Sequence, residues 1–436
     1  MRCPLFIIGL MLVLALPIAY AQESITYGQV VSGEITAEQP VLEYTFDGAD
    51  GDTIYVFMRP SSEELTPMIR LTALGGVLVA EADANNALGA LVGPFTLEGT
   101  TTYTIEATRP DWAADSAGEF SLVVDRVNQL ALEPGLPYSD KLADANRIAF
   151  FSYSGNADDV IRYGVEGPNM GVGVMLPDGT PAFFDGVYDN PASLFNILPQ
   201  DGDYTLFVQT ANEDGADYTL TVSPLEVFPL VEGTPVTGSS DELNPVVFSF
   251  QSDTGKLLAI NATVPDADSR TLAIFPASDP CCDLIRDYGS GPNGNPRIDP
   301  FIVPESGTYY VVLWYDLYSE ENATLDYEVT LGASTLLSLS RGAEINDTVT
   351  PDSGVKTYSY DADLAETMRL TLTQTGGDGW PTLRITGPEG QILYFESGSI
   401  RSVSFEVIFE VAGLYRFEIG NINYEPTSVE YMLRVE

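Results

Sequence analysis

The sequence predicts an all-β protein built of four tandem β-sandwich domains that follow a signal peptide. Three observations support this prediction: a pattern of strands that occurs four times, an alternation of apolar and polar residues with period two, and little helical periodicity. Val, Ile, Thr, Tyr and Phe fill the alternating stretches, and Gly, Pro, Asn and Asp separate them. Short strands with one apolar face each pack as two sheets around a shared core.

The composition excludes several classes of function. The 436 residues carry 19 Lys+Arg against 63 Asp+Glu, a formal charge of −44. Because phosphate binding needs clustered Lys and Arg, nucleic acid is not an expected partner. The chain contains no histidine, which removes Ser-His-Asp and Cys-His catalysis and His-ligated zinc. The hydrophobic fraction of 44% is ample for folded cores despite the charge.

The first 21 residues have the pattern of a signal peptide. A basic start at Met1-Arg2 precedes an apolar run over 5–16, and Ala19-Tyr20-Ala21 fits the small-x-small cleavage pattern. No later stretch reaches 18 uninterrupted apolar residues, so we expect no membrane insertion. The sequence therefore predicts a secreted, periplasmic or cell-surface protein of 415 residues.

Each of the four copies opens on an aromatic, polar, aromatic triplet. A Gly-x-Tyr strand follows later in the second to fourth copies, and the equivalent strand of the first has a longer turn between Gly99 and Tyr103. The triplets are Tyr44-Thr45-Phe46, Phe151-Ser152-Tyr153, Phe248-Ser249-Phe250 and Tyr358-Ser359-Tyr360. The tyrosines of the later strands are Tyr103, Tyr204, Tyr309 and Tyr415. Between them lie a second alternating strand and a Gly-containing hairpin, clearest at 176–179 and 386–390. Closing strands are expected at 120–124, 218–222, 327–331 and 431–435.

The spacing of the copies predicts the domain boundaries. The second aromatic residue of the triplets recurs at intervals of 107, 97 and 110 residues. A period of about 104 residues is the size of a whole domain and too long for one rung of a solenoid. We therefore predict domains at 24–127, 128–224, 225–333 and 334–436, which fill the chain after the signal peptide and leave no room for a separate catalytic domain.

The order of motifs in the first copy resembles a known family. Tyr27-Gly28 and Gly33-Glu34-Ile35 precede the triplet, which runs into Asp47-Gly48-Ala49-Asp50-Gly51-Asp52, and a Gly-x-Tyr-type strand follows. This order resembles the bacterial pre-peptidase C-terminal domain, most clearly in the first copy and least in the second. The resemblance implies a jelly-roll-like sandwich found beside secreted peptidases and similar to collagen-binding domains, some of which hold calcium.

The loop after the first triplet has two interpretations. Asp47, Asp50 and Asp52 place three carboxylates in one short stretch, and closely spaced Asp residues with loop carbonyls can supply the six to eight oxygens that calcium needs. However, Asp and Gly are also the preferred residues of tight turns. The sequence leaves both a calcium site and an ordinary turn open.

The Gly-x-Tyr strand of the third copy predicts a ligand-binding surface. Residues two apart share a face of a strand, so Tyr309, Val311 and Leu313 face the core. The opposite face carries Tyr310 and Trp314, and Tyr318 continues the aromatic series in the next loop. We expect these three to form a flat platform for a sugar ring or an extended peptide, unless a neighbouring domain or loop covers them.

No motif of the sequence supports a catalytic site. Asp253-Thr254-Gly255 spells the aspartic-protease tripeptide, but the repeat aligns it with an ordinary turn. Cys281 and Cys282 are adjacent and are either two thiols or a strained disulfide. We therefore predict a non-enzymatic binding or spacer protein that contacts an extracellular glycan or protein of the envelope or matrix. The alternative is an accessory or regulatory partner of a separately encoded secreted hydrolase.

Overall fold

The computed structural model confirms the all-β class. It describes residues 22–62, 64–84, 88–188, 192–240, 245–264, 270–280, 282–288, 295–315, 325–333, 336–350, 355–388, 391–396, 401–421 and 427–436. Within these residues the chain forms strands β1 to β36 and one turn of 3-10 helix, η1 (Asp111–Ala113), and the strands make eight sheets. No helix in the described part of the chain is long and apolar enough to cross a membrane.

Consecutive groups of nine strands form consecutive pairs of sheets, here called the first to fourth sheet pairs. The first contains β1 (Glu23–Ser24), β2 (Val30–Ile35), β3 (Leu42–Gly48), β4 (Thr53–Pro60), β5 (Met68–Ala73), β6 (Val77–Asp83), β7 (Ala90–Thr96), β8 (Thr101–Thr108) and β9 (Gly118–Arg126). The second contains β10 (Leu130–Ala131), β11 (Tyr138–Leu142), β12 (Ala149–Gly155), β13 (Val160–Glu166), β14 (Met170–Met175), β15 (Pro181–Tyr188), β16 (Ala192–Ile197), β17 (Gly202–Thr210) and β18 (Ala216–Pro224).

The remaining two sheet pairs follow the same plan. The third contains β19 (Val227–Pro229), β20 (Val236–Ser240), β21 (Val246–Ser252), β22 (Leu257–Thr263), β23 (Arg270–Pro276), β24 (Ile285–Asp287), β25 (Arg297–Ile302), β26 (Gly307–Tyr315) and β27 (Leu325–Ala333). The fourth contains β28 (Leu337–Ser338), β29 (Glu344–Val349), β30 (Lys356–Ala362), β31 (Thr367–Gly376), β32 (Pro381–Thr386), β33 (Ile392–Glu396), β34 (Ser402–Ile408), β35 (Gly413–Asn421) and β36 (Val429–Val435).

The strand order is the same in every sheet pair. In the first, five strands run β1-β3-β8-β5-β6 and four run β2-β9-β4-β7, and adding nine to each number gives the orders of the next pair. The Gly-x-Tyr strand lies at the centre of each five-stranded sheet, between the strand of the aromatic triplet and the strand before the hairpin. The predicted hairpin at 176–179 connects β14 to β15, and Gly179 takes a φ of +84°, which an L side chain rarely adopts.

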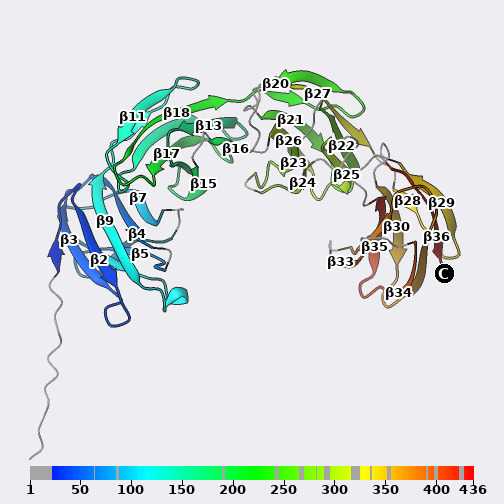
Figure 1. The fold of residues 1–436 in the computed structure, drawn as a ribbon, viewed down its shortest axis with the longest axis horizontal. Helices are drawn as coiled ribbons and strands as arrows, with labels where there is room; N and C mark the ends of the chain where they lie inside the picture. Colours follow the sequence, from blue (N-terminus) through cyan, green and yellow to red (C-terminus); the bar gives the residue numbers. More distant parts are fainter. Residues whose placement is uncertain are drawn as a thin grey trace, which may run out of the picture.

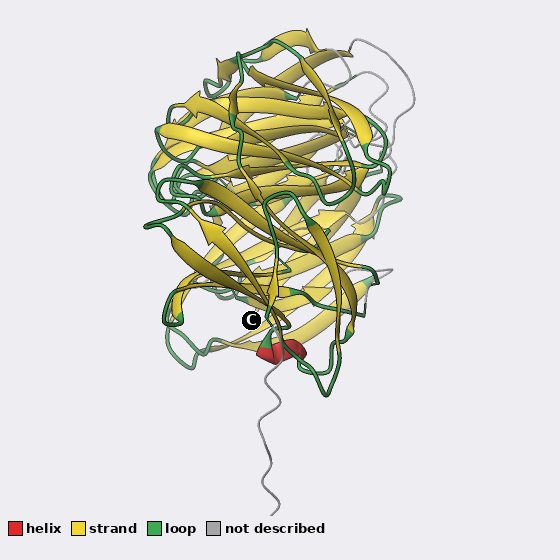
Figure 2. Ribbon diagram, turned by 90° about the vertical axis from the view of Figure 1, so that its left-hand side faces the viewer, coloured by secondary structure: helices red, strands yellow, loops and turns green. Residues whose placement is uncertain are grey.

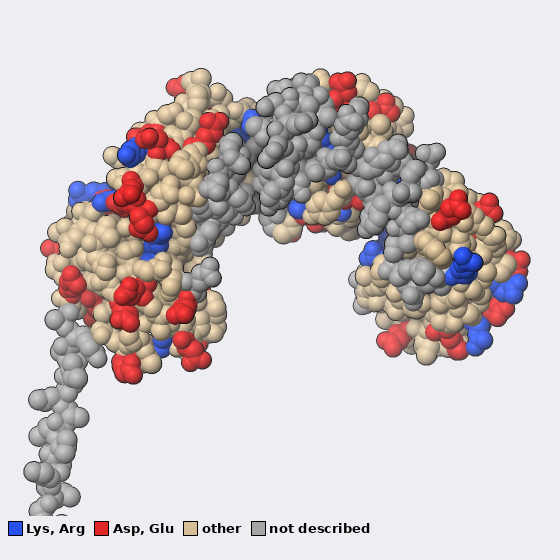
Figure 3. Space-filling view, viewed as in Figure 1, with Lys and Arg blue, Asp and Glu red and all other residues tan. Residues whose placement is uncertain are grey.

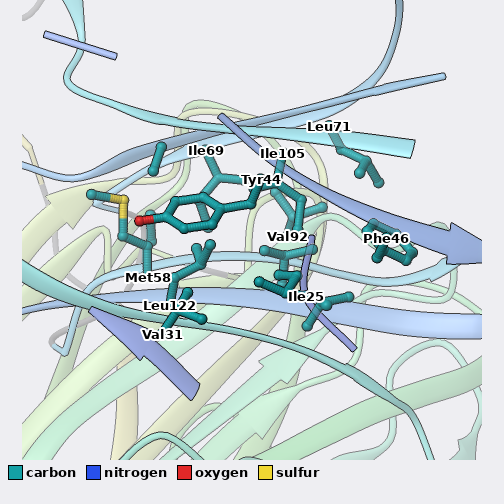
Figure 4. Packing of buried hydrophobic residues seen from close by; sticks show 14 of the residues in the cluster. Ile25, Val31, Tyr44, Phe46, Met58, Ile69, Leu71, Val92, Ile105 and Leu122 are labelled. Atoms are coloured by element: carbon teal, nitrogen blue, oxygen red, sulfur yellow. The ribbon is translucent and has the colours of Figure 1, made fainter. Parts of the chain in front are cut away.

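Each sheet pair encloses its own apolar core, as the alternating strands predict. The Gly-x-Tyr tyrosines Tyr103, Tyr204, Tyr309 and Tyr415 are all at most 1% exposed. In the first pair, Tyr44 and Phe46 from β3 meet Ile69 and Leu71 from β5, Ile105 from β8 and Leu122 from β9. Figure 4 shows these side chains converging between the two sheets. The proposed domain boundaries stay a prediction, because a separate core does not by itself establish independent folding.

The sheet pairs follow one another along an arch (Figure 1), and their strands form a stack when the arch is viewed from one end (Figure 2). We call the contacts between successive pairs the first, second and third junctions. At the first junction, Phe57 and Val123 of the first pair lie in one buried cluster with Phe150 and Phe207 of the second. At the second, Val160 and Ile197 share a cluster with Val247, Tyr310 and Val312.

Candidate functional site

The three aspartates of the predicted calcium loop each have a different partner. The Asp47 carboxylate accepts a hydrogen bond from the Thr102 hydroxyl at 2.7 Å. Asp50 accepts one from the backbone N–H of Gly99, also at 2.7 Å. Asp52 accepts from the backbone N–H of Ala49 at 3.2 Å, across the turn that joins β3 to β4. The Asp52 bond thus lies within the turn, whereas Asp47 is bonded to β8 and Asp50 to the loop that precedes β8.

Asp52 also takes part in a charged cluster with an aromatic ring. The Arg126 guanidinium donates to Asp52 at 3.1 Å, and the Tyr27 hydroxyl donates to the same oxygen at 3.0 Å. The Arg126 guanidinium lies 4.5 Å from the centre of the Tyr27 ring. Chiefly through the hydrogen bond from Arg126, the pKa of the Asp52 carboxyl falls below its ordinary value. Burial, aided by the bond to Asp52, raises the pKa of Tyr27 to about 12.

An acidic residue occupies the position equivalent to Asp52 in the second and fourth sheet pairs. Asp159 accepts from the backbone N–H of Asn156 at 2.8 Å, and Glu366 accepts from that of Asp363 at 3.0 Å. Lys256 occupies the equivalent position in the third pair, where it binds Glu232 at 2.6 Å. This recurrence gives the acidic residue a role in the turn itself.

No group of three or more Asp, Glu, His or Cys side chains in the described part of the chain is arranged to hold a metal ion. A calcium ion at Asp47, Asp50 and Asp52 therefore stays a prediction of the sequence. It would have to compete with Arg126 for the Asp52 carboxylate, because that guanidinium already supplies a positive charge.

The expectation of an exposed aromatic platform is wrong for Tyr310. Its side chain is 4% exposed, because β26 packs against the four-stranded sheet of the second pair. The Tyr310 hydroxyl donates to the backbone carbonyl of Asp158 at 3.2 Å, across the second junction. The second sheet pair covers the outward face of β26, which is the alternative that the sequence left open. Tyr318 lies outside the described residues.

Trp314 is partly buried at the same junction and is covered on its aromatic face. Its ring lies 5.4 Å from that of Phe195 of β16, at an interplanar angle of 60°. The Arg286 guanidinium lies 5.5 Å from the ring centre, and it binds Asp283 at 2.7 Å. Trp314 therefore packs between the second sheet pair and an arginine of β24, and it does not present a free platform.

A cavity of about 580 Å³ lies at the third junction, where the structure has no apolar cluster among its described residues like those of the first two. One wall comes from β24 and the edge strand β25 of the third sheet pair, including Pro300 and Phe301. The other comes from β32, β33 and β35 of the fourth pair, including Phe395 and Gly420. A Cβ at Gly420 would come within 2.8 Å of the Thr382 hydroxyl oxygen, so glycine keeps this wall free of a side chain.

Arginines line both walls of the cavity: Arg286 and Arg297 from the third pair, and Arg384 and Arg416 from the fourth. Among the described residues of the lining, the acidic side chains are Asp287 and Glu418, so arginines outnumber acidic residues there, whereas acidic residues predominate in the whole chain. Acidic side chains are spread over the visible face of the arch (Figure 3). The cavity is therefore a local region of positive charge on an acidic protein.

The two carboxylates of the cavity are already engaged. Asp287 accepts the backbone N–H of Arg297 at 2.8 Å, which ties β24 to β25. Glu418 lies 3.8 Å from the Arg384 guanidinium and 3.7 Å from that of Arg416, longer than hydrogen bonds. Arg384 is the most open of these groups, with 46% of its side chain exposed. The arginines of the fourth pair are thus held near Glu418 while Arg384 keeps contact with solvent.

Two buried hydroxyl groups flank the same face of the fourth pair. Thr357 and Thr386 are 4% and 2% exposed, and their hydroxyls have no hydrogen-bond partner in the described part of the chain. The β-ladder places Thr357 opposite Glu418 and Thr386 opposite Arg416. An unsatisfied buried hydroxyl costs about 1–3 kcal/mol, so these two threonines lower the stability of the fourth pair.

The cavity was not predicted from the sequence, although the charged outward face of the fourth Gly-x-Tyr strand was visible in the sequence. The outward face of the fourth Gly-x-Tyr strand reads Arg416, Glu418, Gly420, whereas the third reads Tyr310, Val312, Trp314. In the sequence alone, the apolar face of the third strand is the unusual one, which is why the sequence predicts the binding surface there. The wall formed by the third pair contains Arg297 and Pro300 of the edge strand β25, which lie 116 residues or more before Arg416 in the chain. Only the folded arrangement brings this wall close to β35.

The aspartic-protease tripeptide is a turn, as the repeat predicts. Asp253-Thr254-Gly255 connects β21 to β22, with Gly255 at a φ of +81°. The backbone N–H of Thr254 donates to the Ser306 hydroxyl at 2.9 Å. Of the two adjacent cysteines, Cys282 is exposed and Cys281 lies outside the described residues, as do residues 1–21.

Comparison with known proteins gives likeness over single parts of the chain. No family model matches, and no curated protein matches in sequence. Among solved structures, the pre-peptidase C-terminal domain of a Bacillus anthracis collagenase is 17% identical, with a TM-score of 0.22, over 25% of this chain and 96% of that one. The periplasmic g-type lysozyme inhibitor PliG of Aeromonas hydrophila is 12% identical, with a TM-score of 0.20, over 24% and 96%. PliG of Salmonella Typhimurium is 19% identical, with a TM-score of 0.18, over 24% and 99%.

Proposed function

We propose that this chain is an exported, non-catalytic binding protein and that the arginine-lined cavity at the third junction holds its extracellular ligand. The observation that carries the proposal is the difference between junctions. Apolar clusters join the sheet pairs at the first and second junctions, and the first junction also holds a smaller cavity of about 280 Å³. The third junction has a cavity of about 580 Å³, lined by apolar residues and arginines, and no such cluster among its described residues. This volume is within the range of about 300–1,000 Å³ typical of small-molecule sites.

The chemistry of the cavity favours holding a ligand over transforming it. Guanidinium groups stay protonated in proteins and cannot act as acid or base near neutral pH. Asp287 accepts a backbone hydrogen bond and Glu418 lies between two arginines, so neither carboxylate is poised next to a nucleophile. The chain has no histidine to transfer protons.

The proposal is tested with the chain without its first 21 residues, screened against a glycan array and a panel of matrix proteins, with and without calcium. We expect a ligand whose binding is lost when Arg384→Gln and Arg416→Gln are combined. A ligand whose affinity is unchanged in this double variant would place the binding site elsewhere and overturn the proposal. The accessory alternative instead predicts a changed rate of a purified secreted hydrolase on addition of the chain.

A further inference from the structure

Resting on the proposed function, we infer that the ligand of the cavity is an acidic saccharide, a sugar chain that carries carboxylate or sulfate groups. The charge of the walls, the shape of the lining and the strand edge that borders the cavity all support this inference.

The charge of the walls selects an anion. Four arginines and two acidic residues are found among the described residues that line the cavity, in a chain with more than three acidic residues for every basic one. Arg286 is held by Asp283 and by the Trp314 ring. Arg384 and Arg416 lie on either side of Glu418 at distances longer than hydrogen bonds, so their N–H groups can turn to a ligand. Because the rest of the surface repels anions, a negatively charged group finds its favourable position where these guanidiniums gather.

The shape of the lining suits a ring that carries the charge. Arginine presents a planar fork of donors that matches the geometry of carboxylate and other oxyanions. Phe395 on β33 is 60% exposed and lines the cavity, as does Pro300 on β25. Flat apolar groups of this kind pack against the C–H face of a sugar ring, while the hydroxyls of the sugar remain available for Thr382 and solvent.

The strand edge argues against an extended acidic peptide. β25 is the edge strand of its sheet, and peptides often bind proteins by adding a strand to such an edge. Here Pro300 lies within β25 and has no backbone N–H, and the register of β25 with β22 is shifted between Leu258 and Ile260. Proline and an irregular register both block the addition of a strand. Recognition through side chains that contact a discrete anionic group is therefore favoured.

The experiment measures binding of defined oligosaccharides to the chain without its first 21 residues by isothermal titration calorimetry. The probes are a galacturonate tetrasaccharide, a sulfated heparin-derived tetrasaccharide and a neutral cellotetraose. We expect at least one acidic probe to bind, with affinity that falls as sodium chloride rises, and the neutral probe not to bind. Combining Arg384→Gln with Arg416→Gln should weaken binding at least tenfold.

A matched control separates the cavity from net charge. Arg369 and Arg434 lie on the outer four-stranded sheet of the same pair, with side chains 59% and 45% exposed. Arg369→Gln with Arg434→Gln removes the same charge and should leave affinity within about twofold, because exposed charges act weakly at a distance. Phe395→Ala, which changes no charge, should weaken binding several-fold without loss of the β-type circular dichroism spectrum.

The outcomes distinguish this inference from the proposed function. Equal loss in the two double variants would mean that net charge governs binding, and the inference would be wrong. Equal binding of cellotetraose, lost in the Arg384 and Arg416 variant, would overturn the acidic character but keep the site. Binding of a matrix protein alone, lost in the same variant, would replace the saccharide by a protein ligand and again keep the proposed function.

Discussion

The second and third junctions place the same face of the same kind of sheet against a neighbour, and they differ in what that face carries. β26 presents Tyr310 and Val312, both buried against the second sheet pair. β35 presents Arg416 and Glu418 at the equivalent positions, and these line a cavity. The core faces of the two strands are nearly alike, since Tyr309 and Tyr415 are both fully buried. The fold thus requires apolar residues on the core face of each strand. The outward face can instead carry apolar residues that pack against a neighbouring sheet pair or charged residues that line a cavity.

The first sheet pair shows what this face looks like without a neighbour. There β5 and β8 place Arg70 opposite Glu106, as β32 and β35 place Arg384 opposite Glu418. Arg70 binds Glu81 at 3.3 Å, and both side chains are 46% exposed. The face of the fourth pair therefore has the charge pattern of a solvent-exposed face, although the third pair lies against it.

The largest expected effect comes from removing an aromatic side chain at the sealed junction. Tyr310→Ala should destabilise the chain by about 3 kcal/mol, because truncation of a buried aromatic residue leaves a cavity. For a unit of about 200 residues this lowers the melting temperature by about 6–12 °C. Differential scanning calorimetry of the full chain measures the shift in the transition that contains the second and third pairs.

The matched control for this prediction is Arg416→Ala, at the equivalent position of β35. Its side chain is 21% exposed and lies 3.7 Å from Glu418, so we expect a loss below about 1 kcal/mol. Similar losses for the two variants would mean that the third junction is as tightly sealed as the second. The comparison between the junctions would then fail.

The same comparison predicts which sheet pair is stable alone. Residues 334–436 have their own core and expose a mainly polar face when separated, so this fragment should unfold cooperatively with a β-type circular dichroism spectrum. Its melting temperature should stay within about 8 °C of that in the full chain, equivalent to about 1–2 kcal/mol. A random-coil spectrum at neutral pH would contradict both the domain boundaries and the polar character of the junction.

Residues 128–224 serve as the contrasting fragment. Separation exposes Phe207 on one side and Val160 and Ile197 on the other, all of which are buried in the chain. Exposed apolar surfaces of this size promote association, so this fragment should form oligomers in size-exclusion chromatography at concentrations where 334–436 is monomeric. Monomeric behaviour of both would show that apolar burial does not distinguish the junctions.

The sequence predicted the fold well because local patterns determine it. Period-two alternation identifies the core face of each strand, and the aligned tyrosines from Tyr103 to Tyr415 are buried as expected. The short parallel strands, such as β10 and β19, were missed, since two or three residues give no periodicity. The site was harder, because exposure of an outward face depends on the neighbouring sheet pair. Tyr310 and Arg416 occupy equivalent positions on the outward face of the central strand of their sheets. Only the packing between sheet pairs determines that Tyr310 is buried at a junction and that Arg416 lines a cavity.

The smallest expected effect concerns calcium at the aspartate loop of the first pair. A cation that binds only the folded state stabilises it by RT ln(1 + [L]/Kd), which is about 0.4 kcal/mol when its concentration equals Kd. Arg126 already binds the Asp52 carboxylate, so we expect a weak site that approaches saturation only in millimolar calcium. Calcium should then raise the melting temperature of the full chain slightly more than sodium chloride of equal ionic strength. Asp50→Ala with Asp52→Ala should remove that difference, and equal shifts from both salts in the unaltered chain would mean that screening alone acts and that the aspartates are turn residues.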